Sequence, residues 1–286
     1  MERQVMEGLT GVRYFGTGDP LPDSGEVVLI TNTHTDLGRW TQLRPRTKAV
    51  IHPNSGFDNL IDADWSEVPT LLGNEIRAEA VAQWTLAALL QNLIPVRHHS
   101  HWPKDRRWDR PLLSSLKVLV IGMGPVGSLI SESLAALGAT PQRSDPYLGF
   151  ELSLHQRFDV VILACSLNPS SRHLINEAFL AQQGDGFLLI NPARGELVDE
   201  KALRDFFRRH PRARAVLDVH AQEPYPANYW SDWPQVIATP HVAGVSGGLI
   251  ARMLEFEARA LRAVLEHNLP TFALLEKRKT SQGYYR

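Results

Sequence analysis

Short apolar runs alternate with helical patterns from about residue 117 onward. The runs consist mainly of Val, Ile and Leu, and the stretches 125–137 and 199–210 between them have apolar positions at helical spacing. Strands of this kind, separated by helices, are typical of a parallel sheet covered on both faces. The expected strands are 117–121, 158–164, 186–191, 213–219 and 235–239, and a poorly specified strand within 139–145 contains Pro141, which favours a sheet edge or a strand start.

A smaller α/β pattern precedes this region. Apolar runs at 12–15, 27–30 and 49–51 predict strands, and residues 76–94 predict a buried helix that Pro95 ends. An amphipathic stretch after His241 predicts a last helix. We therefore expect two domains, a discontinuous one of residues 1–95 and 244–286 and a second of residues 96–243.

Composition narrows the class of protein. The chain has 286 residues, a formal net charge of −1 and one cysteine, Cys165. The near-neutral charge argues against nucleic acid or a membrane surface as a partner, and the lone cysteine excludes an intrachain disulfide. The longest uncharged stretch, 80–96, is too short and too polar for a membrane span, and no secretory signal is visible. We expect a cytoplasmic protein.

A glycine-rich motif marks a nucleotide site. Gly122, Met123, Gly124, Pro125, Val126 and Gly127 follow the first strand of the larger pattern and open a helix. In that context GxGxxG predicts a turn that receives a pyrophosphate at a helix N-terminus. Asp145 lies near the expected distance of roughly 20 residues for an acid that binds the ribose hydroxyls. It favours NAD(H), although the adjacent Arg143 and Ser144 leave NADP(H) open.

Ionisable residues follow the last expected strands. Arg194 follows an Asn-Pro turn, where we expect a buried charge with an anionic partner. Asp218 and Glu223 follow the next strand, and His241 the one after it. Taken singly, these could be a turn cap, a solvated loop acid and a loop histidine. Together they lie at the carboxyl edge of one sheet, where open α/β proteins bind ligands.

These segments carry a family resemblance. The chain resembles the D-isomer-specific 2-hydroxyacid dehydrogenases, a family that includes phosphoglycerate, glycerate and D-lactate dehydrogenases, and it is similar to them chiefly over residues 117–266. The resemblance implies a Rossmann domain, with a doubly wound parallel sheet, and a smaller flavodoxin-like α/β substrate domain that is shortened here. The matching segments are Gly122–Gly127 with Asp145-Pro146, Asn191–Asp199, Asp218–Pro224 and Thr239–Gly244.

Residue roles follow from the resemblance. Arg194 would bind the substrate carboxylate and polarise its carbonyl group, His241 would exchange the proton, and Glu223 would pair with the histidine and raise its pKa. Asp218 would hold the nicotinamide carboxamide, with Ala193 also at the cofactor. The substrate carboxylate would meet the backbone at Ser55 and Gly56. The chemistry agrees, because a guanidinium stabilises a developing alkoxide and an imidazolium can protonate it.

The resemblance therefore predicts an NAD-dependent oxidoreductase that interconverts a 2-oxo acid and a D-2-hydroxy acid. Glu223 argues against a formate dehydrogenase, which has glutamine beside its histidine. The alternative is an NAD(H)-sensing, corepressor-like protein without significant turnover. His98, His99 and His101 lack the partners of a metal site, so we expect none. Trp102 predicts an interface contact, and a two-fold homodimer is the default assembly.

Overall fold

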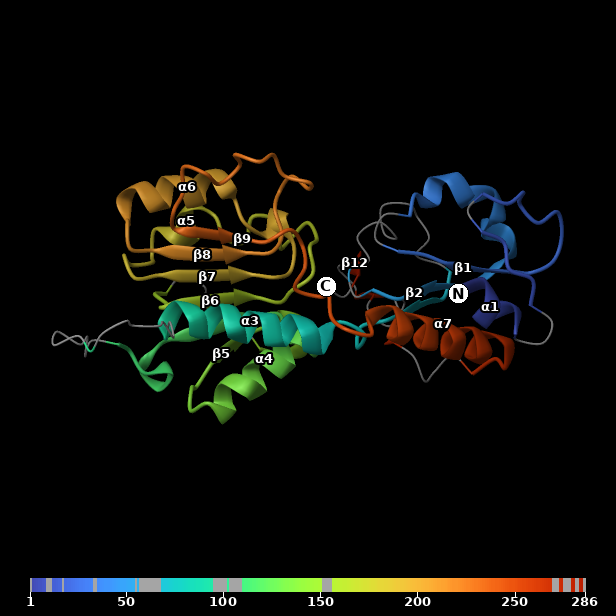
Figure 1. Cartoon of the computed structure of the whole chain (residues 1–286), viewed down its shortest axis with the longest axis horizontal. Helices are drawn as coiled ribbons and strands as arrows, with labels where there is room; N and C mark the ends of the chain where they lie inside the picture. The colour runs from blue at the N-terminus through green and yellow to red at the C-terminus, as the bar shows by residue number, and fades with distance from the viewer. Residues whose placement is uncertain are drawn as a thin grey trace. The chain divides into compact units, whose positions relative to one another are not determined.

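The computed structural model describes residues 2–8, 12–16, 18–32, 35–54, 56, 68–94, 102, 110–150, 156–268, 273–274, 279–280 and 283–284. The chain forms two compact units, Met1–Arg77 with Ser246–Tyr285, and Ala78–Val245 (Figure 1). The first unit is discontinuous. Its first segment ends at Arg77, because the helix α3 (Ala78–Leu93) packs against the second unit.

The second unit is built on a six-stranded parallel sheet. The chain runs from β4 outward to β5 and then returns to β6 on the other side of β4. The boundary between β4 and β6 is therefore the topological switch point, where such sheets bind ligands. The sheet order is β5-β4-β6-β7-β8-β9, with β4 at Val118–Ile121, β5 at Gln142–Ser144, β6 at Val160–Leu163, β7 at Leu188–Asn191, β8 at Arg214–Leu217 and β9 at Val236–Ala238.

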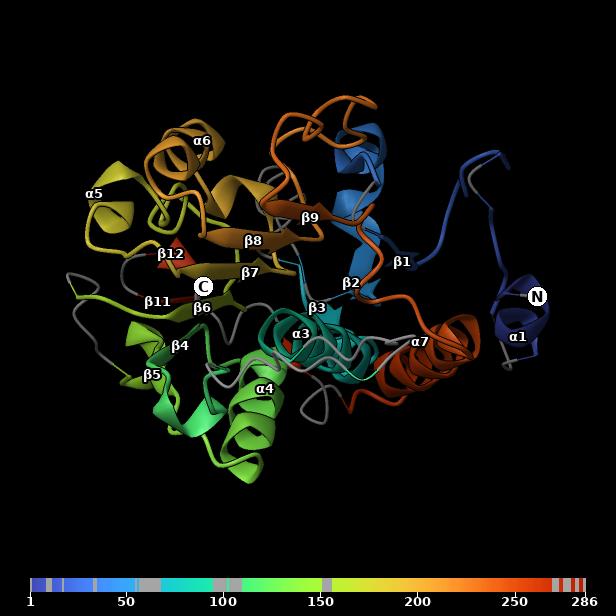
Figure 2. The ribbon, with the colours of Figure 1, turned by 60° about the vertical axis from the view of Figure 1, so that its left-hand side comes forward.

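Helices cover both faces of this sheet, which confirms the predicted doubly wound α/β architecture. Figures 1 and 2 show α3 and α4 (Pro125–Ala136) on one face, with α5 (Glu177–Leu180) and α6 (Glu200–Arg209) on the other. The residues of β4, β6 and β7 are all buried. This is why these strands consist of continuous apolar runs rather than alternating apolar and polar positions.

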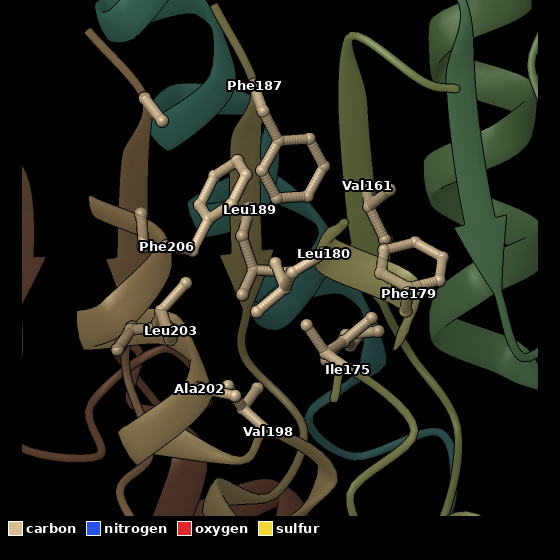
Figure 3. Close-up of a cluster of buried hydrophobic side chains, with 14 of the residues drawn as sticks. Val161, Ile175, Phe179, Leu180, Phe187, Leu189, Val198, Ala202, Leu203 and Phe206 are labelled. Carbon is tan, nitrogen blue, oxygen red and sulfur yellow. The ribbon is translucent and has the colours of Figure 1, made fainter. Parts of the chain in front are cut away.

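The amphipathic helix α6 shows how local sequence builds one face of the core. Its N-cap residue Asp199 accepts a hydrogen bond from the Ala202 N–H at 3.0 Å. Leu203, Phe206 and Phe207 turn toward the sheet and are buried. Figure 3 shows Phe206 beside Phe187, which immediately precedes β7, and the two rings meet edge to face with centroids 5.8 Å apart.

The edge strand β5 is the poorly specified strand of the sequence. Pro141 lies immediately before it, as predicted for a strand start. After β5 the chain makes a short 3-10 turn, Pro146–Leu148, and Phe150 pairs back with Asp145 in antiparallel geometry. This tight return fixes the backbone of Asp145 directly beyond the carboxyl end of β5.

The first unit is a smaller α/β structure. Its sheet has the order β1-β2-β3-β10, and β10 alone is antiparallel to its neighbour. The helix α7 packs against β2 and against the short helix α1. The elements of this unit are α1 (Glu2–Glu7), β1 (Val27–Ile30), the 3-10 helix η1 (Leu37–Arg46), β2 (Thr47–His52), β3 (Thr70–Leu72), α7 (Leu249–Leu265), β10 (Ala273–Leu274), β11 (Lys279–Thr280) and β12 (Gly283–Tyr284).

The strand expected at residues 12–15 was a wrong prediction. Val12 and Tyr14 are partly buried and pack on the core of the first unit, whereas Arg13 and Phe15 are exposed. The alternation of a strand is therefore present, but the backbone makes no ladder with the sheet, because its side chains anchor it beside the core. The sheet begins at Val27 instead.

We predict that Phe206→Ala lowers the free energy of unfolding by about 3–5 kcal/mol, because removal of a fully buried ring leaves a cavity. Urea unfolding followed by circular dichroism measures this change. Leu137→Ala is the control, since its side chain is 53% exposed, and it should cost less than about 0.5 kcal/mol. Equal losses for the two variants would contradict the core assignment.

Candidate active site

The glycine motif forms a turn in which side chains do not fit. Gly122 follows β4 with φ of +94°, and a Cβ on it would lie 2.5 Å from the backbone nitrogen of Cys165. A Cβ on Gly127, in the first turn of α4, would lie 1.8 Å from the carbonyl oxygen of Gly122. Around Gly124, the N-cap of α4, there is open space. The turn thus brings bare backbone to the helix N-terminus, where a pyrophosphate can approach closely.

Asp145 lies against this turn with one oxygen available. The residue is 6% exposed, and its Oδ2 accepts the Met123 N–H at 2.8 Å. Its Oδ1 is buried and accepts no hydrogen bond from the described residues. An orphaned carboxylate oxygen is costly unless a ligand hydroxyl donates to it. The residues present therefore fit the ribose of a dinucleotide.

The loop after β7 is shaped by Asn191, a residue to which the sequence pattern assigned no role. Its buried side chain accepts the Ala193 N–H at 3.0 Å and donates to the Arg194 carbonyl at 2.8 Å. Arg194 is only half-buried, and its Nη1 donates to the Ala193 carbonyl at 2.8 Å. We expected a fully buried charge here, but Arg194 is only partly buried, which reduces the desolvation cost of its charge.

A close backbone contact joins this loop to the next one. Gly195 follows Arg194, and a Cβ on it would lie 2.0 Å from the carbonyl carbon of His220. Only glycine permits this approach. The adjacent Ala221 N–H donates to Oε1 of Glu200, at the start of α6, at 3.0 Å. The loop after β8 is therefore seated on the loop after β7.

Asp218 accepts hydrogen bonds from the loop that follows β9. Its carboxylate is 1% exposed and accepts hydrogen bonds from the Thr239 hydroxyl, the Val242 N–H and the Ala243 N–H. The His241 N–H donates to the backbone carbonyl of Asp218 at 2.8 Å. Asp218 thus positions the segment that carries His241. Its role toward a nicotinamide carboxamide stays a prediction.

His241 and Glu223 form the pair that the resemblance implied. Oε2 of Glu223 lies 2.8 Å from Nδ1 of His241. The backbone of His241 has φ of +55°, in the left-handed region that histidine tolerates better than most residues. The histidine side chain is 51% exposed, so its ring remains accessible although Glu223 holds Nδ1. Arg194, Glu223 and His241 follow β7, β8 and β9, so they share one edge of the sheet.

The remaining residues singled out in the sequence lie outside this edge of the sheet or outside the described residues. Ser55 and His98, His99 and His101 lie outside the described residues. Gly56 is in the first unit, where its carbonyl lies 2.7 Å from Nε2 of the buried His52. Trp102 is 78% exposed. In the described part of the chain, no group of three His, Cys, Asp or Glu side chains could hold a metal ion, and no helix is long and apolar enough to cross a membrane.

A family model described as the NAD binding domain of D-isomer specific 2-hydroxyacid dehydrogenases matches residues 86–243, more than half of the chain. The chain belongs to this family. D-3-phosphoglycerate dehydrogenase of Mycobacterium bovis is 32% identical over an alignment of 240 residues, and the match covers 76% of this chain and 45% of that protein. The chain thus spans about half the length of the curated relatives it matches.

Solved structures of the family share the fold. The TT0316 protein of Thermus thermophilus is 27% identical with a TM-score of 0.70, over 85% of this chain and 84% of that one. A D-isomer specific 2-hydroxyacid dehydrogenase of Xanthobacter autotrophicus, in complex with NADPH and MES, is 23% identical with a TM-score of 0.71, over 92% and 90%. D-lactate dehydrogenase of Aquifex aeolicus, complexed with NAD and lactic acid, is 21% identical with a TM-score of 0.67, over 85% and 84%.

The pKa of Glu223 yields a prediction on stability. Burial raises this pKa, but the hydrogen bonds from His241 and from the His220 N–H outweigh burial and hold it below its ordinary value of 4.5. Glu223 therefore stabilises the folded state above its unfolded pKa, and this contribution is lost as the pH falls through the folded pKa. The difference in unfolding free energy between wild type and Glu223→Gln should shrink as the pH falls below about 4.5.

Urea titrations across this pH range measure the difference. Gln222→Asn changes the exposed neighbour in the same loop and should keep the pH dependence of the wild type. A wild type and Glu223→Gln pair that differs equally at every pH would contradict the lowered pKa.

Proposed function

We propose that this chain is an NAD(H)-dependent oxidoreductase that interconverts a 2-oxo acid and a D-2-hydroxy acid. The observation that carries the proposal is the contact of Glu223 with Nδ1 of His241 at the carboxyl edge of the sheet. With Nδ1 held by a carboxylate, the proton that can reach a substrate is the one on Nε2. Membership of the family supports the same reaction class.

In reduction, the carbonyl carbon of the substrate gains a hydride, its oxygen gains a proton, and the carbonyl double bond becomes a C–O single bond. The nicotinamide cofactor, when bound, supplies the hydride. His241 gives its Nε2 proton to the oxygen, and Glu223 stabilises the imidazolium before transfer. Arg194 binds the substrate carboxylate and stabilises the negative charge that develops on the oxygen. Oxidation runs through the same groups in reverse.

The turn Gly122–Gly127 would hold the cofactor, and Asp145 would set the preference between NAD(H) and NADP(H). The free Oδ1 accepts a hydrogen bond from a ribose hydroxyl, and a carboxylate at this position repels a 2′-phosphate. Arg143 of β5 is the residue that could attract that phosphate, and its guanidinium carbon lies 5.9 Å from the ring centre of Phe150. Because Asp145 is buried against the turn, we assign NAD(H) rather than NADP(H).

Asp145→Ser should shift this preference toward NADPH. The change removes the negative charge beside the 2′ position and leaves Arg143 as the nearest charge on β5, so the ratio of kcat/KM for NADPH to that for NADH should rise by about 10-fold or more, which corresponds to about 1.4 kcal/mol. NADH and NADPH oxidation followed by absorbance measures the ratio. Asp159→Ser, before β6, removes an equal charge away from the turn and serves as control. An unchanged ratio in Asp145→Ser would contradict the assignment.

His241→Gln should lower turnover by about 100-fold or more, because the reaction loses its general acid. NADH affinity, measured by fluorescence titration, should stay unchanged. NADH oxidation is followed with a panel of 2-oxo acids, and His267→Gln, an exposed histidine after α7, is the control. Full turnover in His241→Gln would remove the histidine from the reaction. Binding of NADH by the wild type without turnover on any 2-oxo acid would favour a nucleotide sensor instead.

A further inference from the structure

The ring of His220 lies beneath the proposed acid–base pair, and its hydrogen bonds allow one tautomer. His220 is 3% exposed. Its Nδ1 lies 3.0 Å from Nε1 of Trp230, and its Nε2 lies 3.1 Å from the carbonyl oxygen of Thr239. The indole N–H can only donate and the carbonyl can only accept. Nδ1 is therefore the acceptor, Nε2 carries the proton, and the ring is neutral.

His220 contacts Glu223 directly, and it contacts the loop that carries His241. The backbone N–H of His220 donates to Oε1 of Glu223 at 2.9 Å, while Oε2 of Glu223 holds His241. The Thr239 carbonyl that accepts from the His220 ring lies two residues before His241. His220 thus ties the loop after β8, which carries Glu223, to the loop after β9, which carries His241.

Trp230 is itself fixed from α6. The guanidinium carbon of Arg204 lies 4.3 Å from the centre of the Trp230 ring. Arg204 bonds to Glu200, which also accepts the Tyr229 hydroxyl. Tyr229 in turn meets the Trp230 ring edge to face with centroids 5.3 Å apart. The indole donor is therefore held in place by side chains that do not reach the acid–base pair.

We propose that His220, locked by Trp230 as the Nε2–H tautomer, is a positioning residue that aligns Glu223 and His241 for proton transfer. This inference rests on the proposed function. His220 acts through its two loops and does not touch the substrate. Its loss leaves the Trp230 N–H without its partner and leaves the Thr239 carbonyl only the His241 N–H, so both loops lose their common anchor.

The titratable groups around His220 set the direction of the effect. Glu200 of α6 accepts the Ala221 N–H, Arg204 of α6 lies over Trp230, and the rings of Tyr225 and Tyr229 contact the His220 ring, while Asp218 lies two residues before it. None of these donates to the Glu223 carboxylate, whereas the His220 N–H does. When the anchor is lost and this N–H turns away, the pKa of Glu223 rises toward its ordinary value.

The first experiment reads the tautomer and requires no turnover. Nitrogen-15 NMR of the histidine rings distinguishes the two neutral tautomers, and the His220 signals are assigned with His220→Phe. We expect the Nε2–H form in the wild type. In Trp230→Phe, which keeps an aromatic ring but removes the donor to Nδ1, the Nδ1 signal should shift while the Thr239 carbonyl keeps the proton on Nε2. Trp233→Phe is the matched control, since this indole packs on Phe207 in the same turn. An Nδ1–H tautomer of His220 in the wild type overturns the proposal.

The second experiment measures proton transfer. In Trp230→Phe and His220→Phe, kcat should fall by about 10- to 100-fold because the pair is misaligned, while NADH affinity stays that of the wild type. The acid limb of the kcat/KM profile should move to higher pH, since Glu223 then protonates more readily. His220→Gln retains a donor and an acceptor and should recover part of kcat. Trp233→Phe should change neither quantity.

Merely structural damage is distinguishable from a positioning role. If Trp230→Phe loses stability but its acid limb coincides with that of Trp233→Phe, His220 has no positioning role. A wild type that reduces no 2-oxo acid overturns the proposed function, and the catalytic part of this inference with it. The NMR result still decides whether the anchor exists.

Discussion

The site depends on the hydrogen bonds to one buried carboxylate. Asp218 is almost wholly removed from solvent, a position that destabilises an unpaired charge by several kcal/mol. Three donors from the segment between Thr239 and Ala243 compensate for this. The compensation works only if that segment folds back onto the end of β8. The hydrogen bonds that compensate the buried carboxylate of Asp218 therefore fix the position of the segment that carries His241. They do so without any contribution from a substrate.

Close backbone contacts supply the second constraint. The parallel sheet brings the ends of β7, β8 and β9 to one edge. A side chain at the point where two of the loops touch would keep their backbones apart. Gly195 removes that obstacle between the first two loops. Gly122 and Gly127 do the same where the dinucleotide turn lies against the residues that follow β6. Glycine at these positions serves tight packing of main chain on main chain.

The site combines groups of different exposure, which suits acid–base chemistry. The groups that hold the loops, Asp218 and His220, are buried and fully bonded within the protein. Arg194 and His241, which are proposed to meet the substrate, are partly exposed. Buried, hydrogen-bonded groups thus support partly exposed ones, which is the arrangement that keeps catalytic groups preorganised in enzymes.

Much of the fold could be predicted because the spacing of apolar residues that marks a strand or a helix can be seen within a short stretch of sequence. The apolar runs that became β4, β6, β7 and β8 were found within a few residues, since buried parallel strands need apolar side chains on both faces. The run at 12–15 has the alternation of a strand but does not join a sheet, because pairing depends on which backbone is adjacent in space. The unit boundary at Arg77 likewise depends on what α3 packs against.

The sequence by itself determined the chemistry present: a glycine turn followed by an acid, and Arg, Glu and His beyond successive strands. The tertiary structure decided which of these groups meet and which polar residues support them. His220, Glu200 and Asn191 have no periodic signature, because a polar side chain is identified as buried and bonded only when residues distant in sequence surround it. Hydrophobic period is a property of neighbours along the chain, whereas hydrogen-bond partnership is a property of neighbours in space.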